Sequence, residues 1–120
     1  MIEVKELRIG NMVKYCASFV EITSVPKIKL ETVYFHFGSN ENYCAYIKEI
    51  IPILMTEEWL LKCGFKPCNR NYRFILGRFT YNVGSGWFFG NKKIRKQIHV
   101  HQFQNTYFAL TGEEITISVT

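Results

Sequence analysis

The stretch NYRFILGRFTYNVGSGWFFGNKKIRKQI (residues 71–98) decides the fold, because it divides into short apolar segments of similar length. These segments are rich in aromatic and β-branched residues, and turns containing glycine separate them at residue 77, residues 84–86 and residues 90–91. Aromatic and β-branched side chains favour strands, and glycine adopts the backbone conformations of tight turns. The stretch therefore predicts successive hairpins of an antiparallel sheet.

The first half of the chain continues this pattern. Strands are predicted at residues 6–15, 18–25, 29–37 and 43–53, with turns at residues 10–11 and 38–42 and a stop at Pro26. Several short strands with closely spaced turns are typical of a small twisted sheet that partly closes on itself. We therefore predict a mostly antiparallel, partly barrel-like sheet.

Two segments indicate helices. In TEEWLLKCGF (residues 56–65), Thr56 is a suitable N-cap, and Gly64 fits the left-handed position that follows a helix. Within residues 100–110, apolar side chains recur every three or four positions, and Gly112 follows as the stop. The predicted fold class is therefore α+β, with one or two short helices against the sheet, and the length of 120 residues fits a single domain that spans the whole chain.

The composition indicates a globular protein with anionic partners. The formal charge is +5, 48% of the residues are hydrophobic and 16% are aromatic. A modest positive excess favours a nucleotide or nucleic acid as partner, although a basic surface without any such role is the alternative. No C-x-x-C pair, basic leader or long apolar run occurs, so we expect a cytoplasmic protein with reduced thiols and no membrane contact.

The best functional pattern is a basic strand with aromatic neighbours. Lys93 and Arg95 alternate with apolar residues, so their side chains are expected on one face of a strand. Nearby cations and aromatics that would extend this ligand-binding face are Arg73, Arg78, Tyr72 and Trp87. Cations neutralise phosphates and aromatic rings stack on bases, which suits a phosphate-bearing ligand. The alternative is that the aromatics belong to the core.

Three polar residues of the predicted C-terminal helix are further candidates for ligand contact. They are His101, Gln102 and Asn105, of which the two amides lie three residues apart and so share a side of the helix. An amide offers a donor and an acceptor together, which suits reading a base edge. The same groups can instead tie the helix to the sheet, and both interpretations stay open.

Catalytic and metal sites are not expected. His99 and His101 form an H-x-H pair, but the cysteines that would complete a zinc site have no repeated motif. Cys63 is predicted on the apolar face of a helix near its C-terminal end, where the dipole disfavours a thiolate. The ten acids are all glutamate, which disfavours magnesium-dependent phosphoryl transfer. We therefore expect no catalytic residue, metal or cofactor, and a protein that is not an enzyme.

Three segments together resemble a family of small uncharacterised proteins of Bacteroidota and their phages. They are ELRIGNMV (residues 6–13), IPILMTEEWLLKCGF (residues 51–65) and VHQFQNTYFALTGEEI (residues 100–115). Cys63 stands where the family pattern has Phe, and His99 where it has Tyr, which argues against a metal or catalytic role for either residue. The resemblance implies a phage or mobile-element protein made in the bacterial cytoplasm.

Together these features favour a binding protein. The first hypothesis is an anti-defence sponge that sequesters a phosphate-bearing nucleotide immune signal, and such a sponge is expected to form a homo-oligomer with sites between subunits. The second hypothesis is a nucleic-acid-binding module that uses the same basic face. The third is a protein–protein inhibitor or adaptor of a host factor, with the aromatic surplus as its interface.

Overall fold

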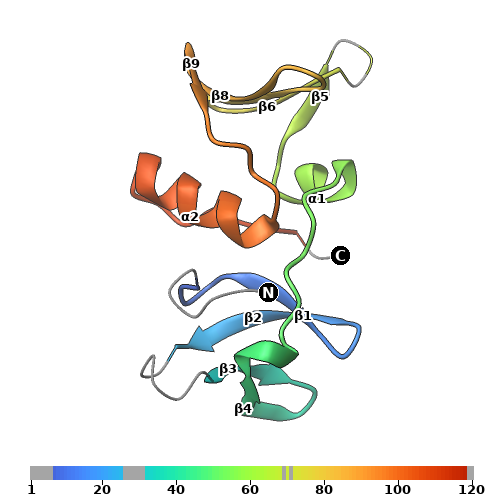
Figure 1. Cartoon of the computed structure of the whole chain (residues 1–120), viewed down its shortest axis with the longest axis vertical. Coiled ribbons are helices and arrows are strands. Elements are labelled where there is room, and N and C mark those ends of the chain that lie inside the picture. The colour runs from blue at the N-terminus through green and yellow to red at the C-terminus, as the bar shows by residue number, and fades with distance from the viewer. Residues whose placement is uncertain (1–6, 26–31, 69, 71, 119–120) are drawn as a thin grey trace. The chain divides into compact units, whose positions relative to one another are not determined.

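The computed structural model describes residues 7–25, 32–68, 70 and 72–118 (Figure 1). The chain forms two compact units, and each is described by itself: Met1–Leu54 with His99–Glu114, and Met55–Ile98 with Ile115–Thr120. The class is α+β with antiparallel sheets, as predicted. Each unit has its own sheet, and neither sheet closes into a barrel, which corrects the partly barrel-like sheet expected from the sequence. The single domain stays a prediction.

The first unit contains a four-stranded antiparallel sheet in the order β1-β2-β3-β4. Its strands are β1 (Met12–Tyr15), β2 (Ser18–Ser24), β3 (Thr32–Phe37) and β4 (Asn40–Tyr46). The strand predicted over residues 43–53 ends early because η3 (Ile47–Glu49) forms a 3-10 turn after it. Beyond this turn, Ile51 and Lys14 exchange backbone hydrogen bonds of 2.8 and 2.9 Å, so β1 is paired on both edges at this point. Residues 29–31 of the predicted third strand lie outside the described residues.

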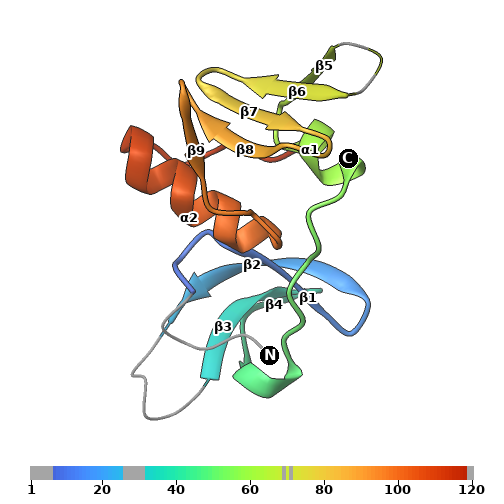
Figure 2. The same ribbon diagram turned by 45° about the horizontal axis from the view of Figure 1, so that its top comes forward.

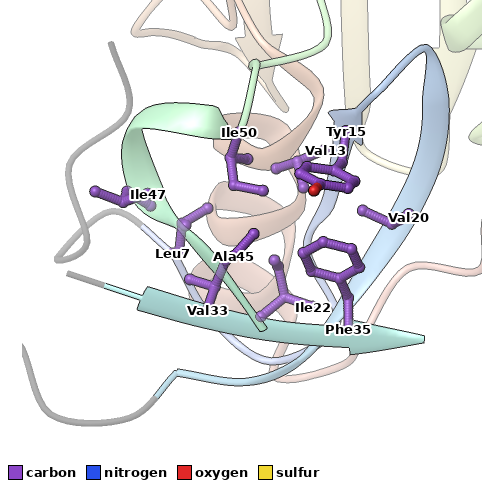
Figure 3. Packing of buried hydrophobic residues seen from close by; sticks show 10 residues of the cluster. All are labelled: Leu7, Val13, Tyr15, Val20, Ile22, Val33, Phe35, Ala45, Ile47 and Ile50. Carbon is purple, nitrogen blue, oxygen red and sulfur yellow. The ribbon is translucent and has the colours of Figure 1, made fainter. Parts of the chain in front are cut away.

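The core of the first unit explains part of the aromatic surplus. Figure 3 shows ten buried side chains between the sheet and η3: Leu7, Val13, Tyr15, Val20, Ile22, Val33, Phe35, Ala45, Ile47 and Ile50. The rings of Tyr15 and Phe35 lie 5.1 Å apart, and the Tyr15 hydroxyl lies 3.0 Å from that of Tyr43. This hydrogen bond and partial burial raise the pKa of Tyr15 above its usual value. These rings therefore stabilise the fold through mutual contact.

The turn between β1 and β2 has an unfavourable sequence for its backbone. Cys16 and Ala17 have φ angles of +47° and +65°, and residues other than glycine or asparagine rarely adopt such conformations. We expect the variant C16N/A17G to be about 1 kcal/mol more stable, since Asn-Gly suits a two-residue turn with positive φ at both positions. The rise in Tm is measured by calorimetry. The variant C16S also removes the thiol but has no such preference, so it should leave Tm unchanged.

The main helix of the first unit is α2 (Val100–Thr111), and it packs against β1. His99 is the N-cap of this helix, and its backbone N–H donates to the side-chain oxygen of Gln102 over 3.0 Å. It ends at Gly112, whose φ of +77° is left-handed, as the sequence predicts. Val100 and Phe103 are fully buried, whereas Tyr107 is half-buried and Leu110 is 44% exposed, so the predicted apolar face is confirmed only for the first half of the helix.

The second unit begins with the short helix α1 (Glu57–Lys62). Thr56 accepts a hydrogen bond from the Trp59 backbone N–H at 3.4 Å, which confirms the predicted N-cap. The N–H groups of Gly64 and Phe65 donate to the carbonyls of Leu61 and Leu60, each over 3.0 Å. This pair of backbone hydrogen bonds is a Schellman motif, and it directs the chain from the helix into the sheet.

Figure 2 shows the five strands that follow, in the order β5-β6-β7-β8-β9. They are β5 (Lys66–Cys68), β6 (Arg73–Leu76), β7 (Phe79–Asn82), β8 (Gly86–Phe89) and β9 (Lys92–Ile94). The predicted turns at residues 77 and 90–91 lie between strands, and the one predicted at residues 84–86 ends one residue earlier, because Gly86 begins β8. All neighbours are antiparallel, so each hairpin fixes the register of the next.

Candidate ligand-binding site

The sheet β5–β9 has an apolar inner face. Phe74, Phe79 and Trp87 are 1 to 3% exposed and alternate with more exposed neighbours along their strands. The Trp87 ring meets the Phe65 ring edge-on with centroids 5.8 Å apart, which connects the sheet to the end of α1. Because side chains alternate between faces with a period of two, the residues between these aromatics point to the opposite side.

That opposite side, called here the outer face, forms two rows set by the strand register. The first row crosses all five strands in the order Lys66, Ile75, Thr80, Phe88 and Lys93. In the second row Cys68 is opposite Arg73, Arg73 is opposite Asn82, and Asn82 is opposite Gly86. The outer face therefore has a lysine at each end of its first row and an arginine in its second.

Four residues of the outer face form a polar group, which we call the cradle: Arg73, Asn82, Gly86 and Lys93. The Arg73 Nε donates to the Asn82 side-chain oxygen over 3.0 Å, so the amide nitrogen of Asn82 stays available as a donor. A Cβ placed on Gly86 would meet Lys93 Cε at 3.3 Å and Nζ at 3.8 Å. The Lys93 side chain thus leans over Gly86, toward the strand that carries Asn82.

The charges of the chain are unevenly distributed between the two units. The second unit carries nine cationic and two acidic side chains, a net charge of +7, whereas the first carries six cationic and eight acidic, a net charge of −2. The two acids of the second unit, Glu57 and Glu58, both lie on α1, and no acid occurs again along the chain before Glu113. Among the described residues, Lys62 is the only cation of this unit in an ion pair, at 3.3 Å from Glu58.

Two of the predicted site residues do not reach the outer face. Trp87 is only 3% exposed, because alternation along β8 places it on the inner face. Arg78 lies in the turn after β6, and its guanidinium lies over the Phe89 ring at 4.6 Å from the centroid. Trp87 therefore cannot stack on a ligand without disruption of the core, and Arg78 is held by an aromatic ring instead.

The remaining predicted residues of this unit are exposed. Arg73 and Lys93 lie on the outer face, and Tyr72, which precedes β6, is 66% exposed. Arg95 follows the end of β9, so the alternation predicted to continue beyond Ile94 does not hold. Gln97 is 4% exposed, and its side-chain nitrogen donates to the Arg95 carbonyl over 2.6 Å, so it turns inward.

The polar residues predicted on the C-terminal helix belong to the other unit and have partners there. Gln102 caps α2 through the His99 N–H, and His101 is 1% exposed. The Asn105 side-chain oxygen accepts hydrogen bonds from Arg8 Nε at 2.8 Å and from Asn11 Nδ2 at 2.9 Å. These contacts favour the interpretation that the group ties the helix to the sheet.

Gln104, which the helical spacing places on a different side from Gln102 and Asn105, completes this connection. Gln104 is 3% exposed; its oxygen accepts from the Met12 N–H at 2.7 Å, and its nitrogen donates to the Gly10 carbonyl at 2.9 Å. Arg8 adds an ion pair with Glu114 at 2.5 Å. The segment around Gly10 is thereby joined to the C-terminal segment.

His99 and His101 lie side by side, and Cys63 lies in the core. The rings of His99 and His101 stack with centroids 5.7 Å apart, and no three His, Cys or Glu side chains come together as metal ligands among the described residues. Cys63 is 2% exposed, and burial raises its pKa to about 12. Its thiol is therefore protonated at neutral pH, consistent with a core residue.

The outer face includes residues that sequence reasoning missed: Lys66, Asn82 and Gly86. Of the aromatic residues that the sequence places near the basic strand, Phe88 is the one that lies on this face within β8. Comparisons with protein families, curated proteins and solved structures find no match to this chain. Among the described helices, none is both long and apolar enough to cross a membrane. The proposed function therefore depends on the residues of the outer face.

Proposed function

We propose that this protein binds nucleic acid, without catalysis, through the outer face of the sheet β5–β9. The observation that carries this proposal is that Lys66, Arg73 and Lys93 share one solvent-facing surface that has no acid. Cations that are not neutralised within a protein attract polyanions, and binding releases the counterions condensed on the phosphates.

The spacing of the cations favours an extended ligand. Lys66 and Lys93 lie at opposite edges of the sheet, four strand spacings apart, which corresponds to roughly 19 Å. A single phosphate reaches only one of these edges, whereas a chain of several nucleotides reaches both. The edge positions of the two lysines also hinder the pairing of this sheet with another.

We expect the affinity for a labelled twelve-nucleotide oligothymidylate to fall about 20-fold between 50 and 200 mM salt. The estimate assumes three phosphate contacts with single-stranded DNA, each adding about 0.7 to the slope of log affinity against log salt. Fluorescence anisotropy measures both the affinity and this slope. An affinity that is insensitive to salt, or absent at 50 mM, would reject the proposal.

The second candidate function is that of a phage anti-defence sponge for a nucleotide immune signal. The observation that favours it is the cradle, in which Arg73 is hydrogen-bonded to Asn82 and the Lys93 side chain lies over Gly86. Two cations and an amide thus share one face of the sheet, and these groups suit the binding of one phosphate group. Such a sponge acts in the bacterial cytoplasm and is expected to be a homo-oligomer. Thermal shifts with cyclic dinucleotides or cyclic ADP-ribose isomers, without binding of oligonucleotides, would favour it over the first function.

A further inference from the structure

Phe88 differs from the other aromatic side chains of the second sheet. Phe74, Phe79, Tyr81, Trp87 and Phe89 each have a ring partner on the inner face, at centroid distances of 4.8 to 6.3 Å. Phe88 lies on the outer face, is partly exposed, and has no ring contact with any described residue. An aromatic ring on a solvent-facing sheet surface is a platform on which a base can stack.

The surroundings of Phe88 match the parts of one nucleotide. Lys93 is its direct cross-strand partner, and Gly86 is two residues away on the same strand and face. Asn82 is its diagonal neighbour across β7, at a distance of about 7 Å. Gly86 has no side chain, and the Lys93 side chain lies over it, so the Lys93 ammonium is held on the same face as the Phe88 ring.

We infer that Phe88 and the cradle form a single-nucleotide subsite, in which a base stacks on Phe88 while Arg73, Asn82 and Lys93 hold the adjoining phosphate. This inference rests on the proposed function and narrows it to single-stranded nucleic acid. In a duplex the bases are already stacked and paired, so their faces are inaccessible to Phe88, whereas a single strand exposes them.

The first test compares an eight-nucleotide oligothymidylate with an abasic oligomer of the same length and charge. The wild-type protein should bind the thymidylate about tenfold more tightly, and the variant F88L should bind both equally, because leucine keeps the bulk but offers no π face. Circular dichroism and Tm check that F88L is folded. Equal affinity of the wild-type protein for the two oligomers overturns the subsite but leaves nucleic-acid binding intact, whereas no binding of either overturns both.

A second readout is independent of affinity differences. The variant F88W places an indole on the outer face, whereas the native Trp59 and Trp87 are buried, with only 4% and 3% of their surface exposed. Base stacking should quench the fluorescence of F88W on addition of thymidylate, with no quenching by the abasic oligomer and none in the wild-type protein. Quenching by both oligomers to the same extent contradicts stacking at this position.

The phosphate half of the subsite is tested by the isosteric variant N82D. A carboxylate there keeps the hydrogen bond from Arg73 but repels the phosphate, so the affinity for thymidylate should fall about tenfold. The control is N91D, which makes the same charge change in the turn between β8 and β9, away from the cradle. Equal effects of the two variants would mean that only net charge matters, and this overturns the cradle as a phosphate site.

Discussion

The variant K66Q/R73Q/K93Q should bind single-stranded DNA roughly 100-fold more weakly than the wild-type protein at 0.1 M salt. Each lost phosphate contact removes a counterion-release contribution of about 0.7 in log affinity under these conditions, so three contacts remove about two orders of magnitude. The salt slope should fall by about 2 for the same reason. The three side chains are exposed and make no ion pair with any described residue, so the fold should be unaffected.

The matched control for this variant is K14Q/K48Q/K92Q, which changes the net charge equally. Lys14 and Lys48 belong to the first unit, and Lys92 alternates with Lys93 and so points away from the outer face. The control variant should lower the affinity for single-stranded DNA only slightly, because it changes the net charge of the protein but removes no phosphate contact. Anisotropy titrations at two salt concentrations measure both variants. Equal losses of affinity in the two would mean that the outer face is not the binding surface.

Much of the second sheet could be predicted from its sequence, because the deciding features are local. Glycine turns at residues 77 and 90–91 separate strands with aromatic and β-branched residues, and hairpins of this kind pair with their neighbours. The strand β5 is not predicted, because its sequence KPC has neither strand propensity nor alternation. It pairs at the sheet edge, where Pro67 is tolerated, and only its register with β6 brings Lys66 onto the outer face.

The face of each site residue was harder to predict than its strand. The period of two correctly separates Arg73 and Lys93 from their apolar neighbours, but it ceases to apply where the strand ends after Ile94. The sequence predicts Trp87 at the ligand and the structure has it in the core, because aromatic rings suit both stacking and cores and composition does not distinguish the two uses. The barrel was wrong because closure depends on pairing between strands distant in the sequence, which propensities do not determine.

The connection between the two ends of the first unit was invisible in the sequence for a similar reason. A glutamine on a helix is usually exposed, yet Gln104 is buried. The reason is that its amide forms hydrogen bonds with the backbone N–H of Met12 and the backbone carbonyl of Gly10, as a neighbouring strand would. These partners are more than 90 residues away along the chain. The amide oxygen of Gln104 accepts from the Met12 N–H, and its amide nitrogen donates to the Gly10 carbonyl. A side chain that replaces Gln104 has to supply both an acceptor and a donor in these positions.

The variant Q104L should therefore be destabilised by about 3 kcal/mol, since it removes the partner of the buried Met12 N–H and of the part-buried Gly10 carbonyl. This corresponds to a fall in Tm of at least about 10 °C. The control is Q102L on the same helix, which removes one capping bond and should cost about 1 kcal/mol. Chemical denaturation measures both, and equal losses would contradict a special role for Gln104.

The variant Q104E separates the two hydrogen bonds by pH. An ionised carboxylate still accepts from Met12 but repels the Gly10 carbonyl, whereas a protonated carboxyl can also donate to it. Burial beside a carbonyl raises the pKa of the new carboxyl in the folded state above its unfolded value. The deficit of Q104E relative to the wild-type protein should thus be smallest at acidic pH and grow as the pH rises through the folded pKa. Parallel denaturation curves at pH 4.5 and pH 7 measure this difference, and a deficit that is independent of pH would show that the Gly10 bond contributes little.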